Sequence, residues 1–141
     1  ELPQDYADMN GWEELSERVA KIYHALPKEK REKCMIYGGN YGHAGSLNYY
    51  RKKYNLPEAQ CFNSSYKMWA KEEVDFDNQI MVEDRRQLSE SEFFNRMILV
   101  DSIHDPFARE KGFIYYRDDP KVDVREAWEN IVRGEKEEFN F

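Results

Sequence analysis

The chain has 141 residues, of which 40% are hydrophobic and 35% are charged, and this balance is typical of a globular domain rather than a disordered segment. Its net charge of −7 argues against nucleic acid and against an anionic membrane surface, because both attract an excess of Lys and Arg. No apolar run approaches the roughly 20 residues that a membrane-spanning helix needs. We therefore expect one domain over residues 1–141, and its start at Glu1 rather than Met suggests a piece of a longer protein.

The first predicted helix begins at Asn10, a good N-cap residue, with Glu13 three residues later as in a capping box. Pro27 helps to end it, and the charged residues 28–33 are expected to form a solvated connection. Its apolar positions recur at helical spacing and predict one buried stripe. These positions are Trp12, Leu15, Val19, Ile22 and Leu26.

Short, continuous apolar runs predict five strands, at residues 34–37, 59–62, 79–82, 97–100 and 113–116. Predicted helices lie between several of them, including residues 44–54 and a segment from Ser89 through Phe94. Such alternation predicts an α/β fold, and we expect a three-layer α/β/α sandwich. Its five-stranded sheet should be mainly parallel, of the Rossmann-like or flavodoxin-like type.

The last predicted helix begins at Asp123, with Glu126 three residues later completing a second capping box. Its apolar residues fall on one face. They are Val124, Ala127, Trp128, Ile131 and Val132.

The most informative segment is the glycine-rich turn that follows the first predicted strand. In open α/β sheets, ligands bind beyond the carboxyl ends of strands, where glycines let the backbone approach closely. The turn lacks both the dinucleotide-binding glycine pattern and the P-loop lysine, so we expect no cofactor. One interpretation is a polar ligand site, and the other is a tight turn whose glycines serve only backbone geometry. The candidate ligand residues are Asn40, Tyr41, Gly42, His43 and Gly45.

A second polar and aromatic segment follows the predicted strand at 59–62. Hydroxyl and amide groups can bind the hydroxyls of a sugar, and aromatic rings can stack on its C–H face. The alternative is an ordinary capped helix with Trp69 in the core. The candidate residues here are Asn63, Ser65, Tyr66 and Trp69.

His104 and Asp105 follow the fourth predicted strand, so His104 is a further candidate at the same edge. A His/Asp pair can perform acid–base chemistry, which leaves open a small stand-alone α/β hydrolase or transferase that uses His43 or His104 with Asp105. No catalytic motif or metal-ligand spacing supports it, and we predict no catalytic or metal-binding residue. Cys34 and Cys61 fit the role of small buried residues, with a disulfide between them left open.

Three segments of the chain resemble the extracytoplasmic C-terminal domain of bacterial multi-span glycosyltransferases related to the dolichyl-phosphate-mannose protein mannosyltransferases. They are residues 6–14 (YADMNGWEE), 40–47 (NYGHAGSL) and 65–70 (SYKMWA). The chain departs from the family pattern at His43, where a Glu is usual, and at residues 62–64, where a Gly-His-Asn run is usual. The resemblance carries over the motif residues Asn40, Tyr41, Gly42, Gly45, Ser65, Tyr66 and Trp69.

The resemblance implies an accessory module on the periplasmic side of a bacterial inner membrane. Its parent enzyme would transfer a sugar from a polyprenyl-phosphate donor, with the catalytic groups in the membrane part. This module would then be catalytically silent alone, and its partners would be the transmembrane part of its own chain and a glycan or polyprenyl-linked sugar. A purely structural docking domain is the third interpretation.

Overall fold

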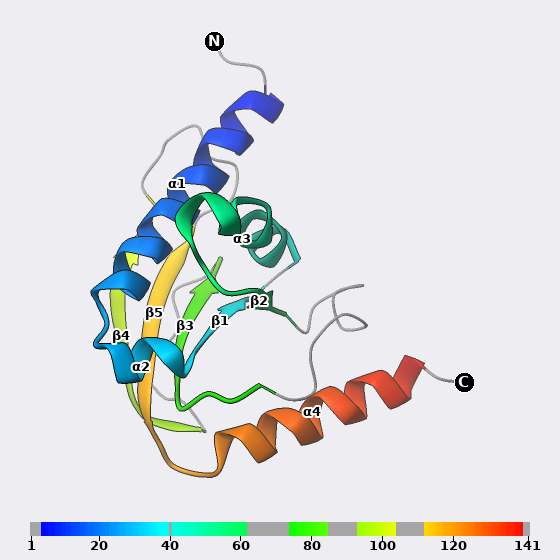
Figure 1. Ribbon diagram of the computed structural model, residues 1–141. Coiled ribbons are helices and arrows are strands. Elements are labelled where there is room, and N and C mark those ends of the chain that lie inside the picture. The colour runs from blue at the N-terminus through cyan, green and yellow to red at the C-terminus, as the bar shows by residue number, and fades with distance from the viewer. Residues whose placement is uncertain (1–3, 40, 62–73, 85–92, 104–111, 140–141) are drawn as a thin grey trace.

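The computed structural model describes the backbone of residues 4–39, 41–61, 74–84, 93–103 and 112–139, and the side chains of residues 11–39, 42–61, 74–84, 93–103 and 112–134. The elements in chain order are α1 (Gln4–Ala25), α2 (Lys28–Glu32), β1 (Cys34–Gly38), α3 (Tyr41–Tyr54), β2 (Ala59–Gln60), β3 (Asn78–Glu83), β4 (Phe94–Ser102), β5 (Phe113–Pro120) and α4 (Val124–Phe139). The strands form one sheet with helices on both sides (Figure 1). The α/β class predicted from the sequence is confirmed.

The sheet is mixed, with the strand order β2-β1-β3-β5-β4. β1 pairs in parallel with β2 and with β3, whereas β5 runs antiparallel to both β3 and β4. The expectation of a mainly parallel sheet is therefore wrong for the half that contains β5. The connection between β4 and β5, residues 103–112, is shorter than the dozen or more residues that a parallel crossover needs.

Each face of the sheet has its own apolar core, because neighbouring residues of a strand point to opposite sides. Ile36 of β1 packs into the cluster that α1 and α3 cover, where Leu15 and Leu47 are also buried. Met35, the preceding residue, packs into the cluster beneath α4, beside Trp128. The predicted buried stripes of the first and last helices thus face opposite sides of the sheet.

Several predicted boundaries differ from the structure. α1 begins at Gln4, so Asn10 lies inside the helix and does not cap it. Residues 28–32 form the short helix α2, although none of them is buried. Phe94, expected in a helix, begins β4, where it is buried opposite Pro120 of β5. The cap at Asp123 is confirmed, since its Oδ1 accepts the backbone N–H of Glu126 at 3.2 Å.

Glu13 joins α1 to α3 instead of capping its own helix. Its Oε1 accepts the hydroxyl of Tyr54 at 3.0 Å and also pairs with the ammonium of Lys53. Further along α1, Arg18 donates to both carboxylate oxygens of Asp101 in β4, at 2.8 and 3.0 Å. These contacts fix α1 across one face of the sheet.

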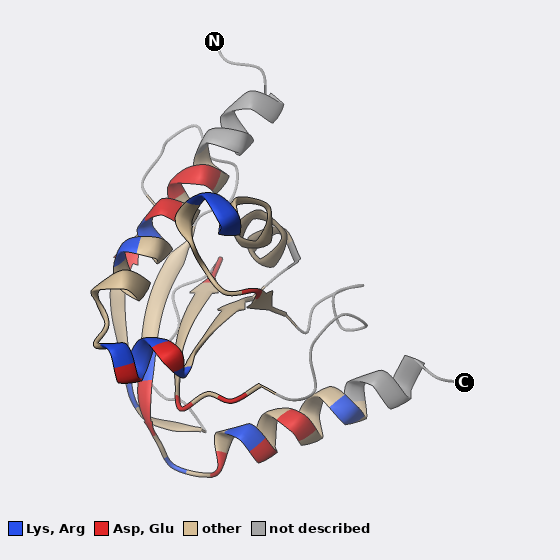
Figure 2. Ribbon diagram, in the orientation of Figure 1, with Lys and Arg blue, Asp and Glu red and all other residues tan. Residues whose placement is uncertain are grey.

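The charges lie mainly on the outer helices. Figure 2 shows both signs of charge along α2 and along the described part of α4, whereas β1 and β2 carry none. Solvated helix faces therefore account for much of the charged composition.

Candidate functional site

Four strands end at the same edge of the sheet, although β5 runs the other way. β1, β2 and β3 are parallel, and both Glu83 at the end of β3 and Ser102 at the end of β4 lie opposite Phe113 of β5. The segments after β1, β2 and β4, which contain the sequence-predicted site, therefore leave the sheet from one edge. Most of the predicted residues fall outside the described residues. They are Asn40, Asn63, Ser65, Tyr66, Trp69, His104 with its neighbour Asp105, and the side chain of Tyr41.

The remaining predicted residues lie in the first turn of α3. Gly42 and Gly45 are half-buried, and His43 is only 1% exposed. The imidazole of His43 packs edge-on against Trp12 of α1, with ring centroids 5.8 Å apart. His43 thus belongs to the interface between α1 and α3, where solvent has almost no access, and this position gives no support to an acid–base role.

The glycines between β1 and α3 serve close packing. A Cβ on Gly38 would lie 2.6 Å from the backbone nitrogen of Ala44, so α3 can approach the strand only above a glycine. A Cβ on Gly39 would collide with the carboxylate of Glu83, and the Gly39 N–H donates to the carbonyl of Val82 at 2.7 Å. Among the described residues no glycine has a positive φ. Glycine is therefore required at positions 38 and 39 because there is no room for a Cβ, and not because the backbone is left-handed.

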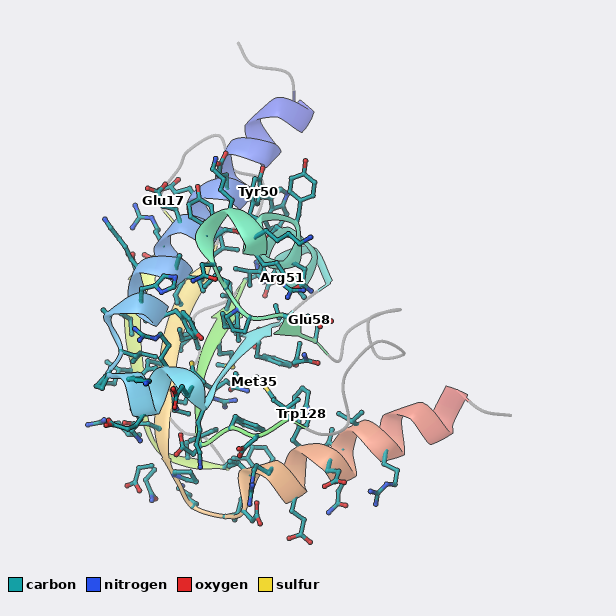
Figure 3. The ribbon with its side chains drawn as sticks, viewed as in Figure 1. Glu17, Met35, Tyr50, Arg51, Glu58 and Trp128 are labelled. Carbon is teal, nitrogen blue, oxygen red and sulfur yellow. The ribbon has the colours of Figure 1, made fainter. Side chains whose placement is uncertain are left out.

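A cavity of about 310 Å³ lies between the sheet and α4, and the sequence did not predict it. Its volume is at the lower end of the range usual for small-molecule sites. Figure 3 shows Trp128 extending from α4 toward the sheet, on the side where Met35 lies. Five aromatic residues line it, namely Tyr37, Phe76, Phe93, Phe94 and Trp128.

Edge-to-face contacts hold part of this aromatic wall in place. The ring of Trp128 lies 6.2 Å from that of Tyr37 at 87°, and 6.1 Å from that of Phe76 at 85°. These distances and angles are those of favourable aromatic pairs. The cavity is therefore bounded by fixed rings from β1, from the segment before β3 and from α4.

Three polar side chains enter the same cavity from the central strands. Gln79 and Glu83 lie four residues apart in β3, and Arg117 of β5 lies opposite Gln79 in the register. Because they share a parity along the strands, all three point to the face covered by α4. The cavity therefore combines an amide, a carboxylate and a guanidinium with aromatic walls.

The guanidinium of Arg117 is held in a defined orientation. Its Nε donates to Oε1 of Gln79 at 2.8 Å, and its Nη2 donates to the same oxygen. Its central carbon lies 5.2 Å from the centroid of the Phe94 ring, which allows a cation–π contact. Burial lowers the pKa of Arg117 below its ordinary value, against the opposing effects of Tyr37 and Glu83.

Glu83 stands at the carboxyl end of β3, where the cavity meets the edge of the sheet. Burial raises the pKa of its carboxyl above the ordinary value, the negative charge of Asp84 raises it further, and Arg117 opposes the shift. A carboxyl group in this position accepts hydrogen bonds when charged and can donate one when protonated.

Two weaker candidates contribute no site. Cys34 and Cys61 are both buried thiols, and burial raises the pKa of the Cys34 thiol to about 12, so it is no nucleophile at neutral pH. A second, more open hollow beside the start of α4 is lined by carboxylates and by Arg125, which pairs with Asp75 at 3.2 Å. These are exposed surface charges.

One signal in the sequence pointed to the cavity. Gln79 and Glu83 stand at the two ends of the apolar run 80–82 of β3, and their even separation places both side chains on the same face of this strand. Arg117 and Trp128, which also line the cavity, lie about 40 and 50 residues further along the chain than Gln79. Local sequence patterns could not predict these two residues as part of the site, because such patterns do not show which distant segments pack together.

Comparison of the chain with protein-family models, with curated proteins and with solved structures found no match. Within the described part of the chain, no helix combines the length and the apolar character that crossing a membrane requires.

Proposed function

We propose that this chain is a non-catalytic accessory domain of a bacterial membrane glycosyltransferase, that it lies on the extracytoplasmic side, and that it binds a glycan. The observation that carries the binding role is the cavity beneath α4, in which aromatic rings and three polar side chains converge. The three sequence segments that resemble the glycosyltransferase accessory domain support the membrane and sugar context.

The chemistry of the cavity suits a sugar. Rings such as Tyr37 can pack against the C–H face of a pyranose, while Gln79 and Glu83 can exchange hydrogen bonds with its hydroxyls. Sugars present both kinds of surface at once, so a wall of rings with a few polar groups recognises them better than either alone.

In this proposal the domain positions an acceptor or a lipid-linked sugar and leaves sugar transfer to the membrane part of its own chain. His43 is buried against Trp12, and the proposal assigns it a packing role. Glu83 then acts as a hydrogen-bonding group, without a nucleophile beside it among the described residues of the cavity.

We also propose that the parallel half of the sheet is Rossmann-like or flavodoxin-like. The order β2-β1-β3 with β1 between two parallel neighbours supports this, as does the presence of helices on both faces. In such folds the crevice beyond β1 and β3 is the usual ligand site. Gly39 and Glu83 lie at that position.

The binding role is tested by calorimetric titration of the domain with a panel of bacterial monosaccharides and oligosaccharides. Tyr37→Leu removes one ring of the cavity and should weaken the best ligand about tenfold, as expected for loss of one aromatic contact. Tyr49→Leu is the matched control, because Tyr49 is 76% exposed on α3 and should not affect binding. Absence of binding by the folded protein at millimolar ligand contradicts the proposal.

The context is tested separately, by sequencing the gene around this segment. The proposal expects hydrophobic membrane-spanning segments encoded before Glu1. A gene that encodes no such segments overturns the membrane glycosyltransferase role while leaving glycan binding intact.

A further inference from the structure

The charge within the cavity beneath α4 is unevenly placed. Arg117 lies at one end, opposite Gln79 and above the ring of Phe94, whereas Glu83 lies four residues further along β3 at the edge of the sheet. Between them the floor is Met81 of β3. A ligand in this cavity therefore meets a guanidinium near the amino end of β3 and a carboxyl group at its carboxyl end.

The position of Arg117 is fixed before any ligand enters. One edge of its guanidinium donates twice to the same oxygen of Gln79, a residue that is itself only 3% exposed and that donates through Nε2 to the sulfur of Met35 at 3.3 Å. The ring of Phe94 limits movement of the guanidinium plane. Such preorganisation reduces the entropy lost when an anion binds.

The neighbouring acidic residues on β5 do not share this cavity. Asp118 follows Arg117 directly and so points to the opposite face of the sheet, where Arg96 donates to its Oδ1 at 2.6 Å. Asp119 is exposed near the end of the strand. The cavity lining among the described residues thus holds one cation, Arg117, and one carboxyl group, Glu83.

We propose that the sugar bound in this cavity carries an acidic group, either a carboxylate or a phosphate, which Arg117 binds while Glu83 contacts hydroxyl groups at the other end. The inference rests on the proposed glycan-binding function and adds the chemical class of its ligand. Guanidinium binds carboxylate and phosphate oxygens through charge-assisted hydrogen bonds, which are strengthened where water is partly excluded. Burial lowers the pKa of Arg117 and so disfavours its charged form, an effect that a bound anion would offset.

The test compares three probes of the same ring size on the unmodified domain: D-glucose, D-glucuronate and D-glucose 6-phosphate. We expect one acidic probe to bind about ten- to a hundredfold more tightly than glucose, the range for a charge-assisted hydrogen-bonded pair. Preference for glucuronate identifies a uronic acid as the ligand type, and preference for the phosphate identifies a sugar phosphate. Equal binding of all three overturns the inference and leaves the glycan-binding function standing, whereas no binding of any probe overturns both.

Variants then assign the preference to Arg117. Arg117→Gln should reduce binding of the acidic probe to the level of glucose, and Arg117→Lys should restore part of it because the charge remains without the two-pronged geometry. Arg133→Gln is the matched control, since Arg133 is exposed on α4 and pairs with Glu129 at 3.4 Å. If Arg117→Gln does not fold, Arg117→Lys and the probe preference of the unmodified domain still decide. An acidic preference unchanged by a folded Arg117 variant contradicts the assignment.

Discussion

The carboxylate of Glu83 occupies the space that a side chain at position 39 would need. Gly39 therefore lets the end of β3 close against the end of β1, and the Glu83 carboxyl group beside it also lines the cavity beneath α4. The glycine-rich turn, which the sequence singled out as a possible ligand site, supports the candidate site through packing.

The two glycines after β1 should differ in their tolerance of alanine. Gly38→Ala forces a Cβ against the backbone of Ala44, which cannot move without shifting α3, and should cost about 1–3 kcal/mol of unfolding free energy. Gly39→Ala should cost less, because the end of the flexible Glu83 side chain can move away. Urea unfolding of each variant measures the difference.

Gly134→Ala provides the matched control for both. Gly134 lies in α4, and a Cβ added there would meet nothing within 4 Å, so alanine should stabilise the helix by about 0.5–1 kcal/mol. Equal losses of unfolding free energy in Gly38→Ala and Gly39→Ala would contradict this explanation, in which the new Cβ meets rigid backbone at position 38 and a flexible side chain at position 39.

Glu83 should make stability depend on pH. Its folded-state pKa is raised by burial, so the folded protein binds the proton more tightly than the unfolded chain. The stabilising contribution of Glu83 to the free energy of unfolding is then greatest at pH values below its ordinary pKa of 4.5. This contribution is lost as the pH rises through the raised pKa of the folded state. Glu83→Gln should remove this loss, so the free energy of unfolding of the variant relative to the unmodified protein should increase from pH 4.5 upward.

Chemical unfolding across that pH range measures the effect. Glu17→Gln is the control, since Glu17 is exposed on α1 and its substitution should leave the slope unchanged. A difference between Glu83→Gln and the unmodified protein that stays constant with pH would show that burial does not shift this carboxyl group.

Asn78 should be the costliest polar side chain to remove on the face covered by α1 and α3. It is fully buried, its Nδ2 donates to the carbonyls of Lys30 and Lys33 at 2.9 and 3.1 Å, and its Oδ1 accepts the Tyr116 hydroxyl at 3.1 Å. Asn78→Ala leaves these groups without that partner and should cost about 2–3 kcal/mol. Thermal and urea unfolding measure it.

Tyr116→Phe removes one of these hydrogen bonds and should cost about 0.5–1.5 kcal/mol. The double variant should lose less than the sum of the two, because both substitutions remove the same bond. Asn95→Ala, at an exposed position of β4, should change stability by no more than about 0.5 kcal/mol. Simple additivity of Asn78→Ala and Tyr116→Phe would contradict the shared bond.

Local signals predicted much of the element order. All five predicted strands overlap strands of the structure, and the apolar stripe that includes Leu15 and Val19 does face the core. The cap at Asp123 could also be predicted from the sequence, because it depends only on the Asp123 side chain and a backbone N–H three residues later. The prediction at Asn10 was wrong because the same cap pattern can occur inside a longer helix.

The sequence by itself determined which segments become strands and helices and which of their faces are apolar, since these depend on spacing along the chain. Only the tertiary structure decided that β5 runs antiparallel, that His43 turns inward against Trp12, and that Gln79, Arg117 and Trp128 line one cavity. The physical reason is that periodicity records whether a residue is buried but not what it is buried against. Pairing and cavity formation depend on contacts between segments distant in the chain, whose partners are chosen by packing of the whole domain.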